Sequence, residues 1–147
     1  MQRERVAQQI GLVLLSAFVL AGAGGLFGNG PLSETTVDAG AVSLRFERFT
    51  RQTFRTHLEI SAETPGPDGL VEIRVAREFL SDVDVLEVRP ASALKRLDRD
   101  VAIFEVPSAA GNATLQLLYE PKRYGVLRTD IVVGAQPAAH LRQIVFF

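Results

Sequence analysis

Histidine serves both metal binding and proton transfer near neutral pH, and this chain of 147 residues contains two, His57 and His140. They lie far apart in the sequence. Because the chain has no cysteine, a metal site would need carboxylates to complete its ligands. His57 falls between Arg55 and Glu59 on the polar side of an alternating segment. We therefore interpret it as a solvated side chain.

Two Asp-x-Asp motifs could supply such carboxylates. Asp82 and Asp84 form the first motif, Asp98 and Asp100 form the second, and each lies near a predicted strand end. Carboxylates that converge from two loops could hold Ca²⁺, which takes six to eight oxygens. Arg99 lies inside the second motif and would neutralise it locally. We favour solvated turn carboxylates and ion pairs, and we predict no metal site.

The patterns that enzymes need for nucleophilic or phosphate chemistry are weak in this sequence. No serine lies in a Gly-x-Ser-x-Gly motif, and the glycine-rich stretch 22–30 falls in the hydrophobic segment and linker described below. The 16 basic and 17 acidic residues nearly cancel, so a nucleic acid partner is not expected. We predict a protein that is not an enzyme, with no catalytic residue, no cofactor-binding residue and no cofactor.

A continuous apolar segment near the start of the chain has a length suited to a lipid bilayer. From Ile10 to Phe27 no residue is charged. A helix of 18 residues is roughly 27 Å long, and including residues 6–9 extends it to roughly 33 Å, against a hydrocarbon core of about 30 Å. We therefore predict a transmembrane helix, a signal-anchor, over residues 6–27 and a lipid bilayer as its partner.

The charges beside this segment predict its direction. Arg3 and Arg5 precede it, whereas the next charged residues are Glu34 and Asp38. The positive-inside rule then places residues 1–5 in the cytoplasm and the C-terminal part outside it, in a single-pass protein of the cell membrane. The alternative is a cleaved signal peptide, because Ala21-Gly22-Ala23 has the small-x-small pattern of a cleavage site.

Small residues recur at helical spacing in the same segment, at Ala17, Ala21 and Gly25. Such a stripe lets two helices approach closely in lipid, so self-association or packing against a membrane protein is one interpretation. The other is that small residues merely fill the weak end of a signal-anchor.

The remainder of the chain alternates apolar and polar residues with a period of two. Residues 28–40 are rich in turn formers, which indicates a linker before a domain at 41–147. Eight segments are candidate strands: 42–47, 54–61, 71–75, 85–89, 101–106, 113–120, 127–133 and 140–146. Most of them alternate, whereas 101–106 carries apolar residues on both faces, as a central strand does. This pattern predicts an all-β fold, an antiparallel immunoglobulin-like β-sandwich of about 7–8 strands after one transmembrane helix.

The connecting segments are short and contain turn formers. We expect residues 64–69 and 108–112 each to join two neighbouring strands as a hairpin, and 91–97 is the one stretch that could be helical.

Four arginines near the start of the domain would lie close to the tether: Arg45, Arg48, Arg51 and Arg55. There they could meet lipid headgroups or an acidic partner, although a solvated sheet face fits them better. Since chain ends usually fray, Phe147 predicts that the last strand is held within a sheet.

The chain resembles uncharacterised bacterial single-pass membrane proteins that have an extracytoplasmic β-sandwich domain. The resemblance rests on the Arg-flanked anchor, on Gly30-Pro31-Leu32-Ser33, on Arg77-Glu78-Phe79-Leu80 and on Tyr119-Glu120-Pro121. It implies a topology and brings no activity.

We expect a non-catalytic, membrane-anchored interaction domain that binds another envelope or membrane protein. The alternative is a β-sandwich that binds a carbohydrate or small ligand, tethered or released after signal-peptide cleavage.

Overall fold

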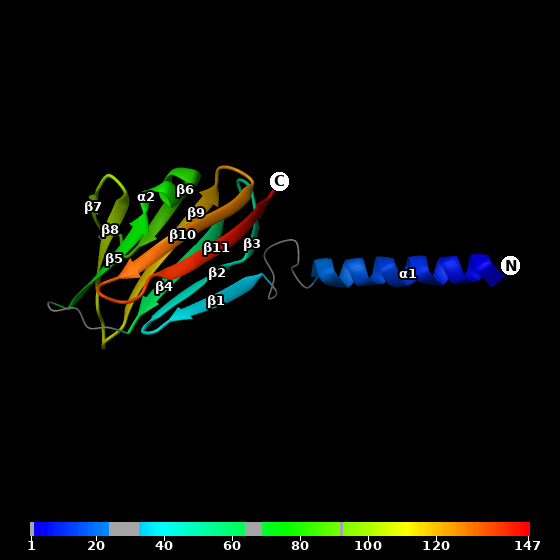
Figure 1. The fold of residues 1–147 in the computed structure, drawn as a ribbon, viewed down its shortest axis with the longest axis horizontal. Helices are drawn as coiled ribbons and strands as arrows, with labels where there is room; N and C mark the ends of the chain where they lie inside the picture. The colour runs from blue at the N-terminus through cyan, green and yellow to red at the C-terminus, as the bar shows by residue number, and fades with distance from the viewer. Residues whose placement is uncertain (1, 24–32, 64–68, 92) are drawn as a thin grey trace.

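The computed structural model describes residues 2–23, 33–63, 69–91 and 93–147. Two β-sheets pack face to face, and a long helix stands apart from them at the N-terminal end (Figure 1). The all-β sandwich predicted from the alternating pattern is therefore confirmed.

The elements follow one another along the chain with short connections. In order, they are α1 (Gln2–Ala23), β1 (Glu34–Ala39), β2 (Val42–Glu47), β3 (Phe49–Arg51), β4 (Thr56–Ala62), β5 (Leu70–Ala76), α2 (Arg77–Asp82), β6 (Val83–Arg89), β7 (Leu94–Leu97), β8 (Val101–Pro107), β9 (Ala113–Pro121), β10 (Gly125–Val133) and β11 (Ala139–Phe146).

One sheet has the strand order β1-β2-β4-β9-β6, and we call it the five-stranded sheet. The other has the order β3-β11-β10-β5-β8-β7, and we call it the six-stranded sheet. Neighbouring strands are antiparallel except β3 and β11, which are parallel. Within each sheet the side chains alternate between the interior and the solvent, as in β4, where buried and more exposed residues take turns.

The inward side chains of both sheets form one core. Its largest fully buried members include Phe46, Leu58 and Leu117 from the five-stranded sheet and Ile73 and Ile131 from the six-stranded sheet. The short helix α2 contributes Phe79, whose ring meets the edge of the Tyr119 ring with centroids 5.4 Å apart. Helix α2 thus covers the sandwich where β5 passes to β6, and aromatic packing holds it there.

The number of strands differs from the prediction. The described residues contain eleven strands rather than about 7–8. β1 lies inside the range 28–40 predicted as a linker, because Glu34–Ala39 pairs in full register with β2. The interpretation of 91–97 as helical was wrong, since residues 94–97 form β7 and the short helix is α2. Tertiary pairing decided these short segments, whose local patterns are ambiguous.

Both predicted hairpins were also wrong. Residues 64–68 lie outside the described residues, but β4 before them and β5 after them belong to different sheets. The turn at 108–112 likewise joins β8 of the six-stranded sheet to β9 of the five-stranded sheet. Alternation predicts which side chains are buried, but it does not predict which sheet receives a strand. The expectation that the last strand is held in a sheet is confirmed, since β11 pairs with β10 and β3.

Helix α1 covers most of the segment predicted to span the membrane, and residues 24–27 of that prediction lie outside the described residues. Of the predicted stripe of small residues, Ala17 and Ala21 are on α1, and Gly25 is outside the described residues. Within the described part of the chain, no helix has both the length and the apolar character needed to cross a bilayer. The span over 6–27 stays a prediction.

Candidate functional site

The two histidines lie on different sheets. His57 is on the solvent face of β4 in the five-stranded sheet, and His140 is near the start of β11 in the six-stranded sheet. The ring Nδ1 of His140 lies 2.6 Å from Oδ1 of Asp130, its partner across the β10–β11 pair. The fold therefore does not bring the histidines into one site.

Both carboxylates of the first Asp-x-Asp motif form ion pairs with basic side chains. Asp82 pairs with Arg123, and Oδ1 of Asp84 lies 3.1 Å from Nζ of Lys122. Both basic residues belong to the turn between β9 and β10. These carboxylates therefore hold that turn against the start of β6.

The second Asp-x-Asp motif has a local contact as well. Oδ1 of Asp98 accepts a hydrogen bond of 2.7 Å from the backbone N–H of Arg99. In ranges 2–23, 33–63, 69–91 and 93–147, no three acidic or histidine side chains gather as ligands of one metal. The two motifs are not brought together as the ligands of a calcium ion.

The arginines predicted to lie near the tether divide into two kinds. Arg45 binds Glu34 on the neighbouring strand β1; this hydrogen bond lowers the pKa of the Glu34 carboxyl and raises the pKa of Arg45. Arg55 pairs with a carboxylate on β9 at 3.4 Å. Arg48 and Arg51 form no ion pair with any described residue. The guanidinium groups of Arg48 and Arg51 are therefore available to an external anion.

One polar contact bridges the two sheets in the core. The hydroxyl of Tyr119, on β9, donates a hydrogen bond of 2.9 Å to Oε1 of Gln143, on β11. Nε2 of Gln143 donates in turn to the carbonyl of Glu47 at 2.8 Å. Burial raises the pKa of the Tyr119 phenol well above its usual value. Because both side chains are fully enclosed, this contact is structural rather than catalytic.

The strand β6 forms an open edge of the five-stranded sheet. It pairs with β9 on one side, and no described strand pairs with its other side. A bulge between Val85 and Glu87 leaves Leu86 without a partner on β9. Val85 and Leu86 are 40% and 45% exposed. An edge strand with exposed apolar side chains presents both unpaired backbone groups and apolar surface to another chain.

A shallow hollow of about 260 Å³ lies beside this edge, over β4, β9 and β6. Polar side chains line it, and they already contact one another: Nε2 of Gln116 donates to Oε2 of Glu59 at 2.8 Å, and Arg89 pairs with Glu87 at 2.5 Å. Pockets for small ligands usually measure about 300–1,000 Å³. The hollow is therefore small for a ligand site, and Glu87 and Arg89 make it continuous with the β6 edge.

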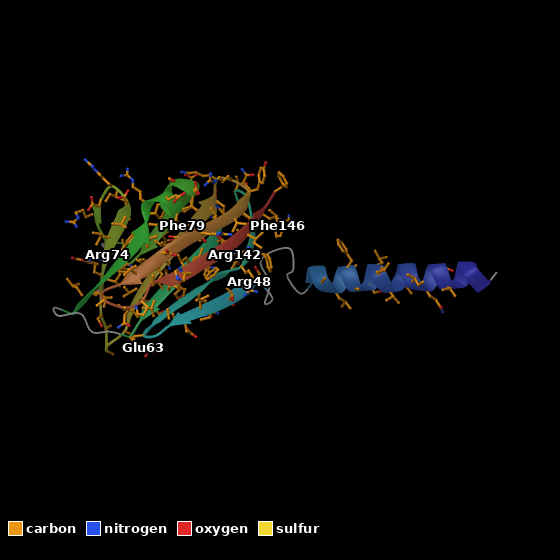
Figure 2. The ribbon with its side chains drawn as sticks, in the orientation of Figure 1. Arg48, Glu63, Arg74, Phe79, Arg142 and Phe146 are labelled. Atoms are coloured by element: carbon orange, nitrogen blue, oxygen red, sulfur yellow. The ribbon has the colours of Figure 1, made fainter. Side chains whose placement is uncertain are left out.

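A second exposed apolar surface lies on the six-stranded sheet. We call it the aromatic face; its members are Phe49, Tyr124, Val126, Ile144, Phe146 and Phe147. Figure 2 shows Phe146, Arg142 and Arg48 at the same end of the sandwich, with Arg74 toward the other end. The sequence singled out only Phe147 among these residues, as a sign that the last strand is held in a sheet. It carried no signal that Tyr124 would join Phe147, because that contact depends on the pairing of β10 with β11.

No protein-family model matches this chain, and no curated protein matches it significantly. Its two exposed surfaces and its N-terminal helix are therefore the features from which a function can be inferred.

Proposed function

We propose that this protein is a non-catalytic, membrane-anchored interaction domain with an extracytoplasmic, immunoglobulin-like β-sandwich. Its partner is another envelope or membrane protein, which binds along the open edge of β6. The observation that carries the proposal is the unpaired edge of β6, where Val85 and Leu86 are exposed beside the hollow.

Strand addition is the binding mode that this edge favours. An incoming extended segment would hydrogen-bond to the unpaired backbone groups of β6, while its side chains contact Leu86 and the hollow. Four strand spacings separate β6 from β1, which is roughly 19 Å at about 4.8 Å each. Because β1 follows the tether, a partner at β6 would not collide with the chain that leads to the membrane.

The N-terminal helix supports anchoring. Its apolar side chains are exposed around the whole helix, including Leu12, Leu14, Leu15 and Leu20 at 61–71%. A helix that is apolar on all sides requires a nonpolar environment such as lipid or the interior of a protein assembly. In the sequence the uncharged run continues beyond α1 to Phe27. We propose that residues 6–27 enter the membrane, with residues 1–5 in the cytoplasm.

Photo-crosslinking in intact cells tests the binding edge. A photoreactive amino acid at Leu86 of the full-length chain should give a discrete adduct with one membrane protein. Leu97 is the matched control, because it is an exposed leucine on the edge strand of the other sheet. Adducts of equal yield from both positions, or adducts only between copies of this chain, would contradict the proposal.

The competing hypothesis is binding of a carbohydrate or small ligand in the hollow, by a domain that is tethered or released after cleavage. The polar side chains His57, Glu59 and Arg89 around the hollow are the observation that favours it. Substituting Gln116 with Leu would remove one of the polar groups of the hollow while Leu86 stays intact. Loss of glycan binding, with crosslinking at Leu86 unchanged, would favour this hypothesis over the first.

A further inference from the structure

The aromatic face is built by the outer surfaces of three adjacent strands. The register places Ile144 of β11 between Phe49 of β3 and Val126 of β10. Phe146 follows two residues later on β11, and its ring stacks on that of Phe49 with centroids 6.1 Å apart. These side chains form one continuous apolar strip across the three strands.

Two further rings extend the strip beyond the ends of the strands. Tyr124, just before β10, and Phe147, just after β11, have ring centroids 4.3 Å apart. Tyr124 is 58% exposed, Phe147 is 84% exposed and Phe146 is 42% exposed. Aromatic rings that pack on one another and remain open to solvent indicate a surface that another phase or molecule covers.

Arginines border the strip without acidic partners. Arg51 pairs in register with Phe146, and Arg128 lies directly opposite Arg142 across the β10–β11 pair. Like charges in this position repel, and none of the three forms an ion pair with a described residue. Asp130, the next acidic residue along β10, is engaged by His140. An external anion would relieve the repulsion.

A groove of about 470 Å³ runs along the same side of the fold. Val37, Phe49 and Ile144 are among its apolar lining residues, and Arg48 and Arg142 are among its charged ones. Among the described residues, the Arg48 guanidinium donates only to a threonine hydroxyl of β1, at 3.4 Å. Apolar walls with guanidinium groups fit a molecule that has a nonpolar part and an anionic part.

The chain from the N-terminal helix enters the domain at this surface. The hydroxyl of Ser33 donates to the carbonyl of Phe49 at 2.7 Å and accepts from its N–H at 3.2 Å. The backbone N–H of Arg48 donates to the Ser33 carbonyl at 2.6 Å. Residues 24–32 between α1 and Ser33 number nine, so they reach at most about 32 Å.

We propose that the aromatic face lies on the membrane surface and that its arginines bind anionic lipid headgroups. This inference rests on the membrane anchor of the proposed function, because the anchor keeps the face within reach of the bilayer. Aromatic side chains prefer the interface between headgroups and hydrocarbon, and arginines near an anionic surface are attracted to it. The β6 edge belongs to the other sheet and stays free for a protein partner.

Tryptophan fluorescence tests the docking, because the chain contains no tryptophan. Three single-tryptophan variants of the full chain are placed in vesicles of phosphatidylcholine and phosphatidylglycerol with brominated acyl chains. Phe147→Trp is the face probe, Leu15→Trp is the anchor probe, and Leu97→Trp is the control on β7. We expect bromine to quench the face probe and the anchor probe and to leave the control unquenched.

Charge reversal tests the arginines. In the protein that carries the face probe, Arg128→Glu with Arg142→Glu should lower the equilibrium constant for docking by about fivefold or more for each arginine. Arg96→Glu with Arg99→Glu is the matched control, because it changes the net charge equally at exposed positions away from the face. The control should leave the quenching of the face probe unchanged.

The outcomes separate the two proposals. If the anchor probe is quenched and the face probe is not, the anchor stands and the docking inference is overturned. If the anchor probe is not quenched, the anchor itself fails. A blue shift of the face probe that depends on protein concentration, without quenching by bromine, would assign the face to contact between two copies and overturn the lipid assignment. Equal quenching in pure phosphatidylcholine would overturn the role of the arginines.

Discussion

At the scale of single residues, Tyr119 and Gln143 connect the two sheets through the core. The pair is fully buried, and each polar atom finds a partner through the chain Tyr119–Gln143–Glu47. Such a contact specifies how the sheets align, because a displacement would leave polar atoms buried without partners.

Removing the hydroxyl should therefore destabilise the domain. Tyr119→Phe leaves Oε1 of Gln143 buried without its donor, which we expect to cost about 1–3 kcal/mol in the free energy of unfolding. Urea denaturation followed by circular dichroism measures this loss. The matched control is Tyr124→Phe, whose exposed ring should make the change nearly neutral for stability. Equal effects of the two substitutions would rule out a role for the bridge.

The same tyrosine makes stability depend on alkaline pH. Burial raises the pKa of Tyr119 in the folded state above the unfolded value of about 10. The unfolded state therefore releases the phenolic proton first, and the stability that is present below about pH 10 is lost as the pH rises further. The difference in unfolding free energy between the wild type and Tyr119→Phe should shrink from about pH 9 to about pH 11 by up to about 1.4 kcal/mol. A constant difference over that range would show that the pKa is not raised.

At the scale of elements, α1 differs from every strand because most of its apolar residues lie open in the described structure. Strands such as β4, β9 and β11 bury one face, whereas Leu14, Leu15 and Val19 on α1 are all exposed. Such a helix alone in water would gain nothing from tertiary packing, which usually supplies most helix stability. We therefore expect α1 to need a nonpolar environment, which the bilayer would provide if α1 is the proposed anchor.

A charge in this helix tests the anchor. Leu15→Arg should cost about 2.5–3.5 kcal/mol if the residue lies near the middle of a bilayer. We expect the variant protein to move from the carbonate-resistant membrane pellet to the supernatant, as measured by immunoblotting. Leu97→Arg adds the same charge at an exposed strand position and should stay in the pellet. Release of the wild type by carbonate would be incompatible with a spanning anchor.

At the scale of the whole molecule, β3 and β11 form the edge of the six-stranded sheet on the side where the tether enters the domain. In the part of the chain that the structure describes, β3 pairs only with the end of β11, through Ile144, Val145 and Phe146. Its other side is an edge, and Ser33 is hydrogen-bonded to its first residue, Phe49. The C-terminal residues thus hold both the sheet and the point where the chain enters the domain.

Shortening the chain tests this arrangement. Deleting residues 144–147 removes the pairing with β3 and the buried side chain of Val145. We expect a loss of about 3 kcal/mol or more in the free energy of unfolding, measured by urea denaturation. Deleting Phe147 alone should change it by less than about 0.5 kcal/mol, because its side chain is exposed. A stable protein ending at Gln143 would show that β3 needs no such support.

Part of the fold could be predicted from local pattern alone. The period of two marks the buried positions of β4, β9, β10 and β11 directly, because successive side chains of a strand point to opposite faces. The two candidate surfaces could not be predicted in this way. Leu86 is exposed because β6 is an edge strand with a bulge, and neither condition is visible in its neighbours along the chain.

By itself, the sequence determined that the domain is an all-β sandwich with its alternating apolar residues inside, since apolar side chains leave water whichever partner strand covers them. Only the tertiary structure decided that β4 and β5 lie in different sheets and that Tyr124 meets Phe147. The physical reason is the distance along the chain over which each of these effects acts. Alternation acts between adjacent residues, whereas strand order depends on the packing of segments far apart in the chain, which sets the surface that other molecules can reach.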